Sequence, residues 1–150
     1  MDKTPLLILN FHPEPLSSEL VAEIETEIGR PVEQRMINFS INTAKLTYPQ
    51  TLSILDKINI KNLPTNVVLH LPGLPTGAVY LVIDFFARTG QFPTVLELVR
   101  DWKDRKSWRV GQFRDLNVEV NATRNNPKRV IWTANDANET DGEPEEKSSS

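Results

Sequence analysis

Cysteine is absent from this 150-residue chain, and histidine occurs only as His12 and His70. The lack of cysteine excludes a disulfide scaffold, a thiolate zinc site, an iron–sulfur cluster and a cysteine nucleophile. No stretch approaches the roughly 18 consecutive apolar residues of a membrane span, and residues 1–5 lack the apolar core of a signal peptide. We therefore expect a cytoplasmic protein of one domain, with no metal, no cofactor and no membrane partner.

The net charge of −3 is unevenly distributed along the chain. Six acids against one lysine give residues 134–150 a net charge of −5, which leaves residues 1–133 with +2. This C-terminal segment is rich in Asn, Glu and Ser and nearly free of apolar residues, so it cannot bury enough surface to offset the entropy of ordering. We expect a folded domain over residues 1–133 and a disordered acidic tail over residues 134–150.

Strand and helix patterns alternate along the first 120 residues. Apolar or extended runs at 6–9, 32–38, 67–71 and 94–99 predict strands. Apolar residues at helical spacing predict one helix that begins near Ser17 and ends at Gly29, a second over 49–58, and a third over 78–89 before Gly90. Residues 108–120 are expected to form one or two further strands, 121–128 a loop, and 129–132 a short edge strand.

This order predicts an α/β fold, a Rossmann-like three-layer sandwich whose mostly parallel sheet has an antiparallel C-terminal edge. The G-x-G-x-x-G fingerprint of classical dinucleotide binding is absent after the first strand.

Ligands of open α/β sheets bind outside the carboxyl ends of the strands, which selects three loops. The first holds Asn10, Phe11 and His12, and the second holds Asn38 and Ser40. The third, residues 71–77, begins with Leu71 and includes Pro72, Gly73, Leu74, Thr76 and Gly77. Gly73 would let the backbone approach a ligand, and free amides at a helix start attract phosphate. The alternative is that two glycines and two prolines only make a tight turn.

Candidates for catalysis are few. His12 could donate to a phosphate oxygen or move a proton, or it is an ordinary loop histidine. His70, inside a strand, is expected to be a satisfied core or near-core residue. Ser40 and Thr76 are more typical of turns and caps, and no nucleophile elbow, P-loop or strand-end pair of acids is present. The sequence favours binding over turnover, and we assign no catalytic residue.

Two surfaces suggest partners. Residues 100–129 interleave basic side chains with Trp102 and Trp108, a pattern typical of a base-stacking platform or of a solvated hairpin. The helix over 78–89 is apolar on nearly all sides, with Asp84 as an acid near its middle. Such a helix must be buried all round, which predicts a two-fold homodimer unless the C-terminal hairpin covers it.

Three segments resemble one small protein family. They are Leu7-Ile8-Leu9-Asn10-Phe11-His12, then Leu71-Pro72-Gly73-Leu74 before a helix, then Arg88-Thr89-Gly90-Gln91-Phe92-Pro93-Thr94 before a strand. Their order and spacing, over residues 6–120, are similar to the Csx-fifteen family of type III CRISPR-associated accessory proteins. Unlike the usual small residues of that family, Tyr80 follows the glycine turn closely, and the hairpin here is highly charged.

The resemblance implies a nucleotide-binding role in antiviral defence, namely binding and sequestering the RNA messenger cyclic tetra-adenylate, a cyclic oligoadenylate, across a homodimer. It implies Asn10, His12 and the amides near Gly73 as phosphate and ribose contacts, with Phe11, Pro72, Leu74 and Arg88 as pocket-forming or supporting residues. A metal-independent ring nuclease and a non-catalytic protein-interaction module are the alternatives. DNA is not an expected partner; ring size and higher assembly on ligand binding stay open.

Overall fold

The computed structural model describes residues 4–64, 66–103 and 107–126. The chain divides into two compact units, residues 1–117 and 118–150. The expected edge strand at 129–132 and the acidic tail lie outside the described residues. In chain order the elements are β1 (Leu6–Asn10), α1 (Ser18–Ile28), β2 (Val32–Met36), α2 (Thr47–Asp56), the 3₁₀ turn η1 (Ile60–Asn62), β3 (Val68–His70), α3 (Pro75–Thr89), β4 (Thr94–Arg100), β5 (Trp108–Asp115) and α4 (Leu116–Arg124).

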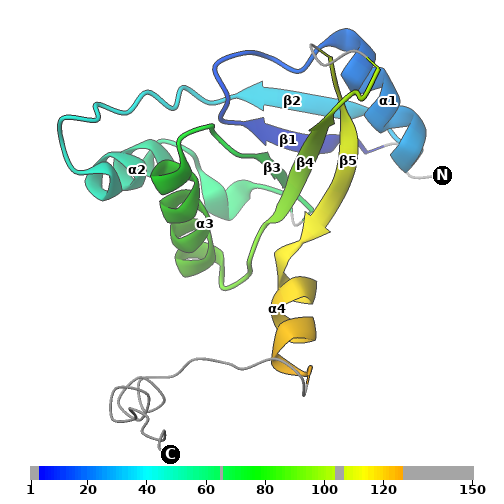
Figure 1. Ribbon diagram of the computed structural model, residues 1–150. Helices are drawn as coiled ribbons and strands as arrows, with labels where there is room; N and C mark the ends of the chain where they lie inside the picture. Colours follow the sequence, from blue (N-terminus) through cyan, green and yellow to red (C-terminus); the bar gives the residue numbers. More distant parts are fainter. Residues whose placement is uncertain (1–3, 65, 104–106, 127–150) are drawn as a thin grey trace, which may run out of the picture. The chain divides into compact units, whose positions relative to one another are not determined.

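The five strands form one sheet in the order β2-β1-β3-β4-β5 (Figure 1). Strand β1 pairs in parallel with both β2 and β3, and β3 pairs in parallel with β4. Strand β5 returns antiparallel to β4. The predicted α/β class, with a mostly parallel sheet and an antiparallel edge, is therefore confirmed.

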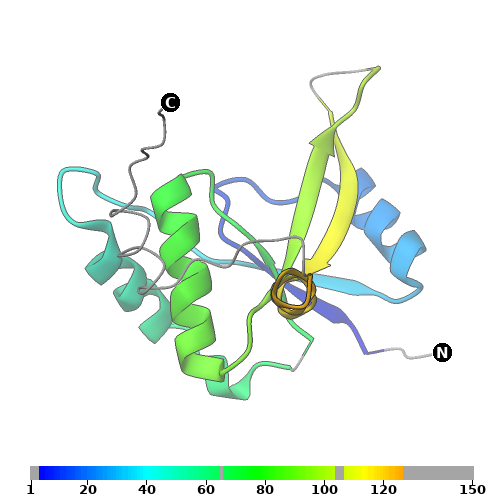
Figure 2. The ribbon, with the colours of Figure 1, turned by 60° about the horizontal axis from the view of Figure 1, so that its bottom comes forward.

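The alternating side chains of β1 enter two separate cores. Leu6 and Ile8 pack with Leu20 and Ile24 of α1. On the opposite face, Leu7, Leu9 and Phe11 pack with Leu55 of α2 and with Leu81 and Phe85 of α3. Figure 2 shows α1 on one side of the sheet and α2 with α3 on the other. Because β1 is buried on both faces, its apolar residues form a continuous run, as expected of a central parallel strand.

Helix ends follow local signals in the sequence. The Ser17 hydroxyl accepts a 3.2 Å hydrogen bond from the Leu20 amide and caps α1, and Gly29 ends this helix in the left-handed conformation with φ of 70°. Gly90 ends α3 in the same way. Helix α3 begins at Pro75, three residues before the predicted start, because proline is well suited to the first helical position. Helix α2 likewise begins at Thr47 rather than at residue 49.

The predictions of a strand up to residue 120 and of a loop from residue 121 were wrong over residues 116–124. Leu116, Val118 and Val120 alternate with polar residues and so resemble a strand, but this segment is helix α4. The Asp115 carboxylate accepts a 2.9 Å hydrogen bond from the Asn117 amide. This bond satisfies an amide at the start of α4. In a strand that continued from β5, the same amide would instead bond to a neighbouring strand.

Candidate functional site

The order of the strands reverses at β1. The chain passes from β1 to β2 on one side and then to β3 on the other side, so the carboxyl ends of β1 and β3 mark a topological switch point, where α/β proteins bind ligands. A cavity of about 890 Å³ opens here and extends between α1 and the β4–β5 hairpin. Its lining includes His12, His70, Leu71, Gly73, Leu96, Leu98, Trp108 and Arg114.

Asn10 is fully buried behind this cavity at the end of β1. Its amide nitrogen donates to the Glu14 carbonyl over 3.1 Å and to Gln34 Oε1 over 3.2 Å. Its Oδ1 accepts the His12 backbone N–H over 2.9 Å and lies 3.0 Å from Nδ1 of His70. Every hydrogen-bonding group of the Asn10 side chain thus has a partner within the chain, and Asn10 positions the two histidines.

The two histidines stack on each other at the cavity wall. Their ring centroids are 5.4 Å apart and the rings are inclined by only 19°. The register of the parallel strands places His70 directly beside Asn10. Burial, and secondly the neighbouring His12, lower the pKa of His70 to about 4. His70 is therefore neutral near pH 7.

The other residues predicted after β1 and β2 lie away from the cavity. The Phe11 ring is buried and packs edge-on against Phe39, with centroids 6.0 Å apart. Asn38 and Ser40 are exposed in the segment after β2 and are not part of the cavity wall.

In the glycine turn, Leu71 and Gly73 line the cavity, whereas Pro72, Leu74 and Thr76 do not. Leu74 is the N-cap residue of α3 and provides no side-chain cap, and Thr76 is exposed in the first helical turn. The structure thus brings His12, Leu71 and Gly73 together, with Asn10 behind them.

The glycines of this turn serve different purposes. A Cβ added at Gly73 would meet nothing within 4 Å, so this position faces open space on the cavity wall. A Cβ at Gly77 would lie 2.7 Å from the ring of Phe39. Gly77 therefore permits the close packing of α3 against Phe39, and Gly73 leaves room for a ligand beside the backbone.

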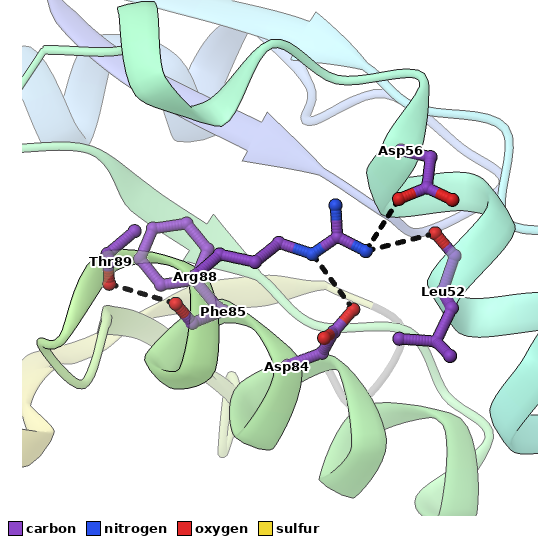
Figure 3. A network of polar contacts seen from close by, with 6 residues as sticks. All are labelled: Leu52, Asp56, Asp84, Phe85, Arg88 and Thr89. Atoms are coloured by element: carbon purple, nitrogen blue, oxygen red, sulfur yellow. Dashed lines mark hydrogen bonds and ion pairs between the residues drawn. The ribbon is translucent and has the colours of Figure 1, made fainter.

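Arg88, implied as a supporting residue, joins α3 to α2 (Figure 3). It is not part of the wall of the large cavity. Its guanidinium contacts Asp84 over 3.2 Å, Asp56 over 2.8 Å and the Leu52 carbonyl over 3.3 Å. Burial opposes the charge of Arg88, but the hydrogen bonds and charges of the two aspartates outweigh it and raise the pKa. Asp84 is 5% exposed, so Arg88 neutralises a buried acid and has a structural role.

Charged and aromatic side chains that sequence reasoning did not assign to the site complete the cavity wall. Four glutamates contribute to it, namely Glu14, Glu19, Glu23 and Glu97. Glu97 lies 3.5 Å from Arg114, and Glu23 lies 3.7 Å from Arg109. The Arg100 guanidinium lies 4.4 Å from the centroid of the Trp108 ring, as in a cation–π pair. The alternation of apolar and polar residues along β4 and β5 could have predicted that Glu97 and Trp108 lie on strands. Their position on the cavity wall depends on tertiary packing.

Within the described residues, no group of three or more His, Asp or Glu side chains could hold a metal ion. None of the described helices combines the length and apolarity needed to cross a membrane. Comparison with protein-family models, with curated proteins and with solved structures finds no match for this chain.

Proposed function

We propose that this protein binds and sequesters cyclic tetra-adenylate at the carboxyl ends of β1 and β3, as a non-enzymatic member of the Rossmann-like Csx-fifteen type of CRISPR-associated protein. The observation that carries this proposal is the cavity of about 890 Å³ at the switch point of the sheet. Its volume lies within the roughly 300–1,000 Å³ of small-molecule sites. The proposed site of action is the cytoplasm, where this RNA messenger would be made and consumed.

The phosphates are proposed to lie at the Gly73 end of the cavity. Gly73 lines the cavity two residues before α3 begins at Pro75, so the positive end of the helix dipole favours an anion there. The cavity wall also holds Glu14 and Glu19, for which no ion pair occurs among the described residues. These carboxylates would repel phosphate, so the phosphates of the ring should face away from them.

Adenine bases have apolar and aromatic surfaces available in the same cavity. Leu96 and Leu98 of β4 supply apolar wall, and His12 and Trp108 supply ring faces. Stacking of a base on an aromatic ring contributes about 1–3 kcal/mol. A ring of four adenylates spanning two protomers would place two bases in each cavity.

One experiment tests both retention and chemistry. The purified full chain is incubated with cyclic tetra-adenylate, bound ligand is measured by equilibrium dialysis, and the recovered nucleotide is analysed by mass spectrometry. We expect retention of the ring and recovery of intact ligand. Linear di-adenylate produced over many turnovers would refute sequestration in favour of a metal-independent ring nuclease, and a folded protein that retains no ring would refute both.

The glutamates favour a second function, a non-catalytic interaction module that accepts a cationic partner segment. Glu14 and Glu19 on the wall, for which no ion pair occurs among the described residues, would complement a basic peptide. Dialysis against a tetra-adenylate ring and against an arginine-rich peptide, each at low and high salt, separates the two. Retention of the peptide alone, lost at high salt, would replace the nucleotide proposal with this one.

A further inference from the structure

Two backbone amides determine how the Asn10 side chain is oriented. The Leu16 N–H donates to Gln34 Oε1 over 3.0 Å, so the Asn10 atom 3.2 Å from the same oxygen must be its donor, Nδ2. The His12 N–H donates to the other end of the amide, which must then be Oδ1, over 2.9 Å. Both amides independently require the same orientation.

This orientation fixes the tautomer of His70. Asn10 Oδ1 can only accept hydrogen bonds, and it lies 3.0 Å from His70 Nδ1, so Nδ1 carries the hydrogen and donates it. With a pKa of about 4, the ring is neutral near pH 7. A neutral imidazole with its hydrogen on Nδ1 has a lone pair on Nε2.

The lone pair on Nε2 belongs to a ring on the cavity wall. His70 lines the cavity, and among the residues that the structure describes, Nε2 has no hydrogen-bond partner. An acceptor on the wall of an open cavity is available to a ligand that supplies a donor.

We infer that His70 is a ligand-binding residue of this cavity, which accepts a hydrogen bond at Nε2 from an N–H or O–H group of the ligand, and that Asn10 positions it. The identity of the ligand rests on the proposed function. A phosphodiester has no donor, so Nε2 faces the base or the ribose and the phosphates lie elsewhere. In cyclic tetra-adenylate the donors are the adenine 6-amino group and the ribose 2′-hydroxyl.

Two variants separate the acceptor role from the structural role. His70→Asn retains a donor to Asn10 Oδ1 near the position of Nδ1 and removes Nε2. His70→Phe retains a ring to stack on His12 and removes both nitrogens. If His70 only anchors Asn10, His70→Asn binds the ring as the wild type does. If Nε2 accepts from the ligand, both variants raise Kd by about tenfold, the loss expected for one hydrogen bond in a partly buried site.

Three rings identify the donor. Isothermal titration compares cyclic tetra-adenylate with the corresponding ring of purine ribosides, which lacks the 6-amino group and gains no donor, and with the 2′-deoxy ring. The wild type should discriminate by about tenfold against the analogue that lacks the contacting donor, and His70→Asn should lose that discrimination. An unchanged Kd in His70→Asn would overturn the inference. So would a His70→Asn variant that loses affinity for all three rings by the same factor.

A spectroscopic measurement keeps this inference separate from the proposed function. In ¹⁵N-histidine-labelled full-length protein at pH 7, the His70 signals should show hydrogen on Nδ1 and none on Nε2. A wild-type protein that binds none of the rings refutes the proposed function and the ligand assigned to His70. Hydrogen on Nε2 instead refutes the acceptor role itself, whatever the ring assays show.

Discussion

Removal of the Arg88 guanidinium, as in Arg88→Met, should destabilise the fold strongly. Arg88 contacts Asp84 and Asp56, and the Asp84 side chain is only 6% exposed whereas that of Asp56 is 66% exposed. The methionine retains most of the apolar stem, so the variant tests the charge. It leaves the Asp84 carboxylate buried in α3 without its cation.

The size of the effect follows from these exposures. Breaking a buried ion pair by removing one partner costs about 3–5 kcal/mol. The Arg88 side chain is 29% exposed, so water would replace part of the lost interaction, and we expect a loss of about 2–3 kcal/mol. With an m-value of roughly 1–3 kcal/mol/M, the urea midpoint should fall by about 0.7–3 M.

Two comparisons isolate the buried charge as the cause. Asp56→Asn removes the exposed partner and should cost no more than about 1 kcal/mol. Arg88→Met combined with Asp84→Asn should be more stable than Arg88→Met alone, because the uncompensated charge is gone. A urea midpoint of Arg88→Met close to that of the wild type, or no recovery in the double variant, would refute this account of Arg88.

Three further predictions concern the glycine turn and His70. Gly73→Val should leave the urea midpoint unchanged, because this position faces open space, and should raise the Kd for the ring at least about tenfold by blocking the cavity wall; unaltered affinity would show that the turn is only structural. Gly77→Val should instead lower stability by about 1–3 kcal/mol, because its side chain would overlap the Phe39 ring; a urea midpoint equal to that of wild type would contradict this packing. The pKa of His70 is about 4 in the folded state and 6.5 in the reference state, so the unfolded chain binds more protons between these values, and stability should fall as pH is lowered through this window. The difference in stability between wild type and His70→Asn should follow this pH dependence, and a constant difference from pH 7 to pH 4 would contradict the burial of a neutral ring.

The sequence predicted the parts of the fold that depend on local patterns. The run from Leu6 to Leu9, the cap at Ser17 and the glycine at Gly29 each act within a few residues, and each is found where expected. Residues 116–120 show the limit of that reasoning. Their period-two pattern predicted a strand, but the bond to Asp115 starts a helix instead.

The candidate site was only partly predictable for a different reason. His12 and Gly73 follow strand ends, so the rule for α/β sheets finds them without knowledge of packing. The position of His70 depends on the register between β1 and β3, which places it beside Asn10. Trp108 reaches the cavity only because the β4–β5 hairpin lies beside α1. No spacing within the sequence encodes either contact.

Assembly through α3 gives the last prediction, because this helix has an apolar face that no other described residues cover. Val79 is 57% exposed and Ile83 is 50% exposed, whereas Leu81 and Phe85 on the sheet side are buried. The cavity lies on the α1 side of the sheet and α3 on the other, so two cavities can share one ring only if the two-fold axis passes near the first turn of α3, beside Gly73. Val79 lies about 6 Å closer to that turn than Ile83 along the helix. We therefore expect Val79→Glu and Ile83→Glu both to yield monomers in analytical ultracentrifugation, with the larger loss of ring affinity in Val79→Glu. A wild-type protein that remains monomeric at tens of micromolar, an order-of-magnitude range for weak association, with saturating ring present, would show that one protomer binds the ligand alone.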